Sequence, residues 1–374
     1  MKKLFTLTAL LVCFMVHAQS PKEILYVGTY STRGSEGVYV LEFDRANGSL
    51  KQIQTVSNAK SPSFLAIHPT GNYLYSVNEG AANSGGVSSY TIEPKTGRLT
   101  MMNQQSSHGR GPCHIAIDQT GKLAFVSNYG GGTFTVLPIR NDGTLGLATD
   151  TLKYEGKGTH PQRQEKAHIH SATVSPNNRF VYVCDLGTDK VYIYEFDKAS
   201  GKVKPAATPY ASVSPGSGPR HIAIHPNGKY LYLVEELTST VATFALNSKT
   251  GALTLLQDNV KTLPADFTGK NTSADIHTDP KGKFLFHSNR GYDALAILSI
   301  ANDGKVSLIG QQPTEGKTPR NFLVDPKGEY VFAANQDTDN IVVYKLDGKT
   351  GKLTPTGTQL NVPSPVCLKL FTVK

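Results

Sequence analysis

Tryptophan is absent from this chain of 374 residues, and cysteine occurs only four times. Without Trp, a stacking platform for carbohydrate is disfavoured. Three of the cysteines, Cys113, Cys184 and Cys367, are widely separated, which matches neither a disulfide framework nor the spacing of metal ligands. We therefore expect all three to be small buried apolar side chains.

Catalytic motifs and concentrated charge are also missing. No G-x-S-x-G, H-E-x-x-H or Walker-type P-loop occurs in the sequence, so serine hydrolysis on its usual motif is unsupported. The net charge of +9 is mild for this length, and no run of lysines or arginines concentrates it. Nucleic-acid-binding proteins usually cluster their positive charge. We therefore expect no nucleic-acid partner, and the excess is a weak indication of small anionic substrates.

The N-terminal segment has the pattern of a targeting signal. A positively charged start, Met1–Lys3, precedes the apolar run LFTLTALLVCFMV, and a small-x-small motif ends at Ala18. This predicts a secretory signal peptide over residues 1–18. The apolar run is too short to span a membrane. We expect a periplasmic or secreted protein without stable membrane insertion, in which residues 19–374 form a single domain.

Six related segments recur through the chain. Each has strand-like apolar alternation on both sides of a tight turn, and successive turn residues are 50, 57, 50, 54 and 46 positions apart. Every repeat reads as four strands, and no convincing amphipathic helix occurs between them. Repeats of this length and content are typical of a β-propeller. The turn residues are Gly71, Gly121, Asn178, Gly228, Gly282 and Gly328.

A seventh repeat is divided between the two ends of the chain. Residues 24–30 resemble the second strand of a repeat, 37–44 the third and 49–56 the fourth. The missing first strand matches residues 364–371. Pairing the two ends would close the ring and remove exposed sheet edges. The sequence therefore predicts an all-β, seven-bladed propeller with four-stranded blades, closed by N-terminal strands pairing with the C-terminal strand.

Polar residues gather at one end of the predicted ring. The first two strands of a blade form an antiparallel hairpin, so the start of the first and the end of the second lie together. The first strand of each blade lines the central channel, so these positions should surround one mouth of it. The positions eight residues before the turn residues are Ser63, Cys113, His170, Arg220, Ala274 and Arg320. The positions eight residues after them are Glu79, Tyr129, Leu186, Glu236, Arg290 and Gln336. The divided blade adds Val366 and Tyr30.

Two interpretations of this mouth compete. Arg220 and Glu236 could form a cross-strand ion pair with no further role, contributing about 0–1 kcal/mol if exposed. Several ionisable groups that converge on one concavity instead favour a binding or catalytic site. We favour the site, because strand interiors repeat for packing while the mouth positions diversify.

The His-x-His pair at His168 and His170 raises the question of a metal. Residues two apart face the same side of a strand, and such a pair can bind zinc, but catalytic zinc normally has a third protein ligand. His114 and Glu236 are possible third ligands, with nothing to fix their distances. We favour proton transfer or hydrogen bonding by the histidine at the mouth, and expect no metal and no cofactor.

Five segments together resemble the lactonase family of seven-bladed propellers: YVGTY, SNYGGG, AHIHSATVSPNNRFVYVCDLGTDKV, GPRHIAIHPNGKYLYLVEE and TPRNFLVDPKGEYVFAANQ. The family includes propeller-type 6-phosphogluconolactonases and 3-carboxymuconate lactonizing enzymes, and the resemblance spans residues 24–372. It implies a lactone ring opened or closed without a metal. It also implies a site of one histidine, two arginines and one glutamate, which correspond in this chain to His170, Arg220, Arg290 and Glu236.

Two features depart from the family pattern. Glu235 and Glu236 stand where the family usually has Asn-Glu, so the sequence leaves open which carboxylate faces the channel. The predicted signal peptide is the second departure. Since 6-phosphogluconolactone is a cytosolic metabolite, another sugar or uronic lactone stays open as the substrate of an exported enzyme.

Our expected function is the hydrolysis of a small anionic or sugar lactone, as by a 6-phosphogluconolactonase. His170 or Glu236 would act as general base, and Arg220 and Arg290 would stabilise the oxyanion. The open alternatives are a non-catalytic exported propeller binding a glycan or protein partner, a muconate-type lactonizing enzyme, and a metal-dependent lactonase. We expect a monomer or weak dimer. Substrate contacts are expected from His168, Glu79, Tyr129, Arg320, Gln336, Glu235 and Tyr30.

Overall fold

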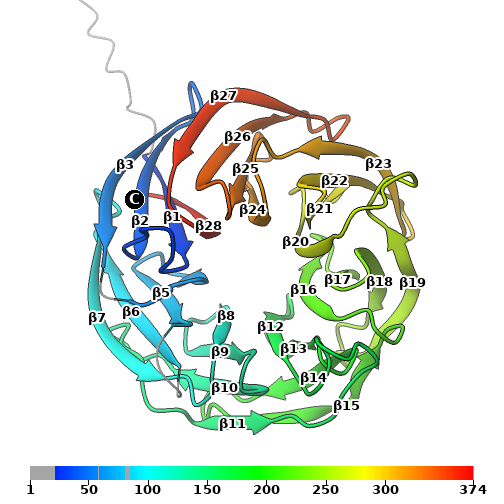
Figure 1. The fold of residues 1–374 in the computed structure, drawn as a ribbon. Helices are drawn as coiled ribbons and strands as arrows, with labels where there is room; N and C mark the ends of the chain where they lie inside the picture. Colours follow the sequence, from blue (N-terminus) through cyan, green and yellow to red (C-terminus); the bar gives the residue numbers. More distant parts are fainter. Residues whose placement is uncertain (1–21, 58, 81–84, 374) are drawn as a thin grey trace, which may run out of the picture.

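The computed structural model describes residues 22–57, 59–80 and 85–373, so the predicted signal peptide over residues 1–18 lies outside the described residues. Within these ranges the chain forms 28 strands in seven four-stranded antiparallel sheets. The sheets are arranged radially as the blades of a propeller, with the first strand of each blade nearest the axis (Figure 1). Among the described residues, no helix has the length and apolar character needed to cross a bilayer.

The blades follow one another along the chain, and the strands of each blade are named from the innermost outward. Blade 1 contains β4 (Leu65–Ile67), β5 (Tyr73–Asn78), β6 (Gly86–Ile92) and β7 (Leu99–Ser106). Blade 2 contains β8 (Pro112–Ile117), β9 (Leu123–Asn128), β10 (Thr133–Pro138) and β11 (Asp150–Lys153). Blade 3 contains β12 (Ile169–Val174), β13 (Phe180–Asp185), β14 (Lys190–Phe196) and β15 (Val203–Ser212).

The remaining blades have the same order. Blade 4 contains β16 (Pro219–Ile224), β17 (Tyr230–Glu235), β18 (Thr240–Leu246) and β19 (Leu253–Lys261). Blade 5 contains β20 (Thr272–Thr278), β21 (Phe284–Arg290), β22 (Ala294–Ile300) and β23 (Val306–Pro313). Blade 6 contains β24 (Pro319–Val324), β25 (Tyr330–Asn335), β26 (Asn340–Leu346) and β27 (Leu353–Asn361). Blade 7 contains β28 (Pro365–Thr372), β1 (Glu23–Thr29), β2 (Val38–Asp44) and β3 (Ser49–Val56).

Buried tyrosines on the second strands join neighbouring blades. The hydroxyl of Tyr26 donates to the carbonyl of Gly97 at 2.8 Å, and Tyr182 makes the same contact with Gly251 at 3.1 Å. Each acceptor lies in the turn between the third and fourth strands of the next blade. Gly97 has a φ of 70°, and a Cβ there would lie 2.5 Å from the side chain of Ile24. Only glycine fits this close approach between blades.

The ring closes as the sequence predicts. Strand β28 pairs antiparallel with β1, from Glu23 opposite Thr372 to Thr29 opposite Pro365. Figure 1 shows the C-terminal strand beside the N-terminal strands, so blade 7 is built from both ends of the chain. The described cysteines, Cys113, Cys184 and Cys367, are buried and free, which confirms their prediction as small buried side chains.

The closing strand can be tested through Leu368, which is 1% exposed and packs between blades 6 and 7. Leu368→Ala should lower the free energy of unfolding by about 2–5 kcal/mol, because it leaves a cavity at the junction. Urea denaturation measures the change. As a control, Leu147 is 74% exposed, and Leu147→Ala should change stability by no more than about 0.5 kcal/mol. Equal effects of the two substitutions would contradict closure through β28.

Candidate active site

One buried carboxylate lies at the centre of the predicted mouth. Glu236 directly follows β17 and is 3% exposed. Its Oε2 lies 3.0 Å from Nε of Arg220, and its Oε1 lies 3.2 Å from Nη2 of Arg290. Nε2 of His170 lies 3.8 Å from Oε2. The structure therefore brings together the four residues that the sequence assigned to catalysis.

The backbone holds Glu236 in place between two blades. Its N–H donates to the carbonyl of Gly218 at 2.8 Å, and its carbonyl accepts from the N–H of Ser273 at 3.0 Å. The first contact belongs to the hairpin of blade 4, and the second reaches the start of blade 5. The carboxylate is therefore fixed by the junction of two rigid sheets rather than by a loop.

A third arginine joins this cluster, which the sequence did not reveal. Nη2 of Arg163 lies 2.6 Å from Oε1 of Glu236 and donates to the hydroxyl of Tyr129 at 3.2 Å. Arg163 comes from the irregular connection between β11 and β12, outside the strand positions that spacing can align. The one signal for it is the 57-residue interval, the longest between turns, since long connections are often functional.

Electrostatics fix the charge of the two predicted bases. Burial alone would raise the pKa of Glu236, but attraction to Arg290, Arg220 and Arg163 outweighs it and lowers the pKa to about 2. Burial, followed by repulsion from Arg220, holds the pKa of His170 well below its usual value. At neutral pH the site therefore contains a carboxylate bound to arginines and a neutral imidazole.

The arginines supply more positive charge than the carboxylate balances. Burial lowers the pKa of Arg290 to about 9 despite the attraction of Glu236, so Arg290 is still mostly charged at neutral pH. Arg320 lies over the ring of Tyr30 at 5.3 Å and forms no ion pair with any described residue. Nearby, Glu79 accepts a hydrogen bond from Ser63 at 2.5 Å. An accessible cation in such a mouth favours anionic ligands.

His168 supports Tyr129 instead of pairing with His170. Its ring stacks on Tyr129 with centroids 4.4 Å apart, and its Nδ1 lies 3.1 Å from the Tyr129 carbonyl. Its Nε2 lies 3.1 Å from Glu165. Tyr129 also packs edge-on against the ring of His170 at 5.5 Å, so it lies against both histidines. Among the residues that the structure describes, no group of three or more His, Cys, Asp or Glu side chains is arranged to hold a metal ion.

Glu235 lies apart from the cluster, contrary to its expected place among the substrate contacts. It is fully buried, and its Oε2 accepts from the hydroxyl of Thr240 at 2.6 Å. Burial raises the pKa of Glu235 to about 8. Glu236, and not Glu235, is therefore the carboxylate that meets the arginines. Gln336 lies at the rim, where its amide donates to Asp337 at 3.2 Å.

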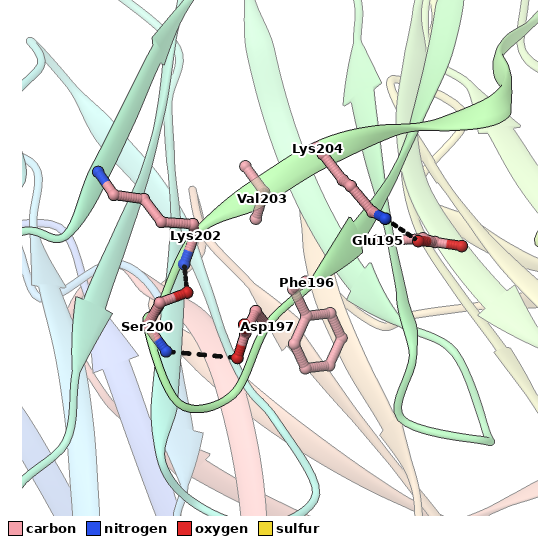
Figure 2. Close-up of a pocket in the computed structure, with 7 residues that line it drawn as sticks. All are labelled: Glu195, Phe196, Asp197, Ser200, Lys202, Val203 and Lys204. Carbon is pink, nitrogen blue, oxygen red and sulfur yellow. Dashed lines mark hydrogen bonds and ion pairs between the residues drawn. The ribbon is translucent and has the colours of Figure 1, made fainter.

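A hollow of about 470 Å³ lies elsewhere, beside the turn between β14 and β15 (Figure 2). Its polar contacts are local: Lys204 pairs with Glu195 at 3.0 Å, and the N–H groups of Ser200 and Lys202 bond within the turn. None of the mouth residues lines it. We therefore assign the chemistry to the mouth and not to this outer hollow.

Buried histidines make stability depend on pH. His287 is fully buried, neither ring nitrogen has a hydrogen-bond partner among the described residues, and burial lowers its pKa to about 3. In the unfolded chain, His287 takes up a proton near pH 6.5, whereas in the folded protein it stays neutral. The free energy of unfolding should therefore fall as the pH drops from 6.5 to 5, by about 1.4 kcal/mol per pH unit for this group. His287→Gln should reduce that slope, as urea denaturation at several pH values can measure.

The comparison between pH 7 and 8 serves as an internal control for this substitution. His287 is neutral there in both folded and unfolded chains, so variant and wild type should change in parallel. An unchanged slope below pH 6.5 would mean that His287 does not stay neutral in the folded protein.

Comparisons with known proteins agree with this architecture. The family model described as "Lactonase, 7-bladed beta-propeller" matches residues 24–370. A 6-phosphogluconolactonase of Bacillus subtilis is 36% identical over 351 residues, covering 94% of this chain and 99% of that protein. One from Formosa agariphila is 35% identical over 360 residues, covering 93% and 99%.

Solved structures give the same result. A putative 6-phosphogluconolactonase from Bacteroides fragilis superposes with a TM-score of 0.88 at 32% identity, covering 94% of this chain and 98% of that one. The periplasmic gluconolactonase of Pseudomonas aeruginosa also has a TM-score of 0.88 at 32% identity, covering 94% and 100%. The chain belongs to the lactonase family of seven-bladed β-propellers.

Proposed function

We propose that this protein hydrolyses a sugar or sugar-acid lactone, as its 6-phosphogluconolactonase relatives are named for doing. The observation that carries the proposal is the buried Glu236 carboxylate, bound by three arginines beside the neutral imidazole of His170. A cluster of this kind supplies a proton acceptor and fixed positive charge at one point. Lactone hydrolysis needs both.

His170 is the better proton acceptor of the two expected bases. Both oxygens of Glu236 are engaged, Oε1 with Arg163 and Arg290 and Oε2 with Arg220. A carboxylate with a pKa of about 2 also has little tendency to take a proton. His170 is neutral at pH 7, and the nearby carboxylate stabilises the imidazolium as it forms.

The reaction then proceeds in two steps. A water molecule gives a proton to Nε2 of His170 as its oxygen attacks the ring carbonyl, and Arg220 and Arg290 stabilise the oxyanion that forms. The ring C–O bond breaks as the carbonyl re-forms, and His170 returns the proton to the departing ring oxygen. The product is the open hydroxy acid, which ionises in solvent.

Arg320 is assigned to an anionic group of the substrate. It is the arginine of the mouth that lacks an ion pair among the described residues, and Tyr30 holds it in place. Tyr129, Glu79 and Gln336 are assigned to substrate hydroxyls from the same rim, and His168 acts only by holding Tyr129. The substrate is thus a lactone carrying a carboxylate or phosphate.

The N-terminal sequence pattern supports a location outside the cytoplasm. Residues 1–18 have the composition of a signal peptide, and the relative from Pseudomonas aeruginosa is named as a periplasmic gluconolactonase. We therefore assign the protein to the periplasm or the secreted fraction, acting there as a single propeller domain without a metal or cofactor.

Arg220→Ala tests the enzymatic proposal. Losing one cation at the oxyanion should lower kcat by about 10²–10³-fold, measured on purified mature protein with 6-phosphogluconolactone, gluconolactone and uronic lactones. Arg220→Lys keeps a charge and should lose less. Lys204→Ala, at the outer hollow of Figure 2, is the control and should behave as wild type. Ring opening at the buffer rate for every lactone would overturn the proposal.

Arg320→Gln tests the assignment of the anionic group. Removing a charged hydrogen-bond donor should raise KM for phosphorylated or uronic lactones by about ten- to a hundredfold, while kcat changes little. Neutral gluconolactone should show no such change in KM. Equal losses for the charged and neutral substrates would instead mean that Arg320 supports the mouth as a whole.

A further inference from the structure

A second ring of side chains lies one layer below the mouth. Phe64, His114, His221, Asp275 and Asn321 come from five different blades and contact one another near the axis. The rings of His114 and His221 have centroids 5.3 Å apart, and those of Phe64 and His114 lie 4.2 Å apart. Asn321 donates its amide to Asp275. We call this set the lower ring.

Bulges in the innermost strands bring the lower ring to the axis. In β16 the pairing shifts between Pro219 and Ile222, and in β20 it shifts between Ser273 and Ile276. A bulge breaks the alternation of faces along a strand. His221 therefore lies near the axis directly after Arg220 instead of pointing away from it. On its other side the lower ring borders a hollow of about 520 Å³, lined in part by Lys369.

Asp275 fixes the proton position on His221. Its Oδ1 lies 2.8 Å from Nδ1 of His221, and its Oδ2 lies 3.0 Å from Nε2 of His277. Burial would raise the pKa of Asp275, but the charge of His277 and hydrogen bonds from both histidines hold it well below its usual value. A carboxylate can only accept hydrogen bonds. His221 therefore carries its proton on Nδ1, and its Nε2 is a bare acceptor.

The ring of His221 lies next to the ring of His170, the proposed base. The rings of His170 and His221 have centroids 5.3 Å apart at an interplanar angle of 74°. Nδ1 of His170 and Nε2 of His221 are both buried and have no hydrogen-bond partner among the described residues. Buried polar atoms normally bond to protein or to an ordered water. One water between the two rings would satisfy both, provided that Nδ1 of His170 is the donor.

We propose that Asp275 and His221 are positioning residues that fix the tautomer of His170 through this water. With its proton on Nδ1, His170 presents a bare Nε2 toward Glu236 and the substrate. The inference rests on the proposed function, in which Nε2 accepts the proton from water. Because His170 returns that proton to the ring oxygen, the chain from Asp275 carries no net proton; it only sets which nitrogen is basic.

The tautomers can be read directly by NMR of the mature protein with ¹⁵N-labelled histidine. In wild type, His221 and His170 should both give the pattern of a proton on Nδ1. In Asp275→Asn a neutral amide no longer compels this state, so both rings should become mixtures of tautomers. The same variant should lower kcat by about ten- to a hundredfold, with KM within about twofold.

A second variant keeps the test decisive if Asp275→Asn does not fold. His221→Gln removes the link itself, so His170 should again become a mixture and kcat should fall. Lys369→Met, on the far side of the lower ring, is the matched control and should change neither tautomers nor kcat. A wild-type proton on Nε2 of His170, or tautomers unchanged in both variants, would overturn the inference. If the wild-type protein opened no lactone, only the proposed function would be overturned, because the NMR pattern needs no substrate.

Discussion

The buried carboxylate of Glu236 is the contact on which the candidate site depends. Arg163, Arg220 and Arg290 come from different parts of the chain, and each has a nitrogen within 3.2 Å of a carboxylate oxygen. Without this carboxylate, the three arginines would face one another with no counter-charge between them, and an unpaired buried charge costs several kcal/mol. The ion pairs hold the arginines in place, and the arginines in turn keep Glu236 ionised.

This cluster is built across three neighbouring blades of the ring. Arg163 precedes blade 3, whereas Arg220 and Arg290 belong to blades 4 and 5, so their convergence is a property of the circle and not of any one sheet. Pairing of β28 with β1 completes blade 7 and so closes the circle. The tyrosine–glycine contacts between blades then keep the junctions tight. This packing between blades holds the residues of the mouth in fixed positions.

The sequence predicted the fold and much of the mouth, because both follow from local rules. Turn spacing and strand alternation define the blades, and a fixed count from each turn finds His170 and Arg220. This count does not find Arg163, because Arg163 lies in an irregular connection. The count does not find Asp275 either, because a bulge changes which residues face the axis. Only the structure distinguishes Glu236 from Glu235, because the sequence does not show which of two adjacent carboxylates faces the channel.

The bulges also explain how one set of strands supplies two layers with different properties. In a regular strand, a residue next to Arg220 would point away from it, but the shift in β16 lets His221 reach the axis. The upper layer then carries the arginines to which we assign anion binding and oxyanion stabilisation. The lower layer carries the imidazoles of His114 and His221, whose pKa values burial lowers, beside the carboxylate of Asp275. Since these groups are buried, protein contacts and not bulk solvent determine which nitrogen holds each proton, and that pattern can extend to His170 at the mouth.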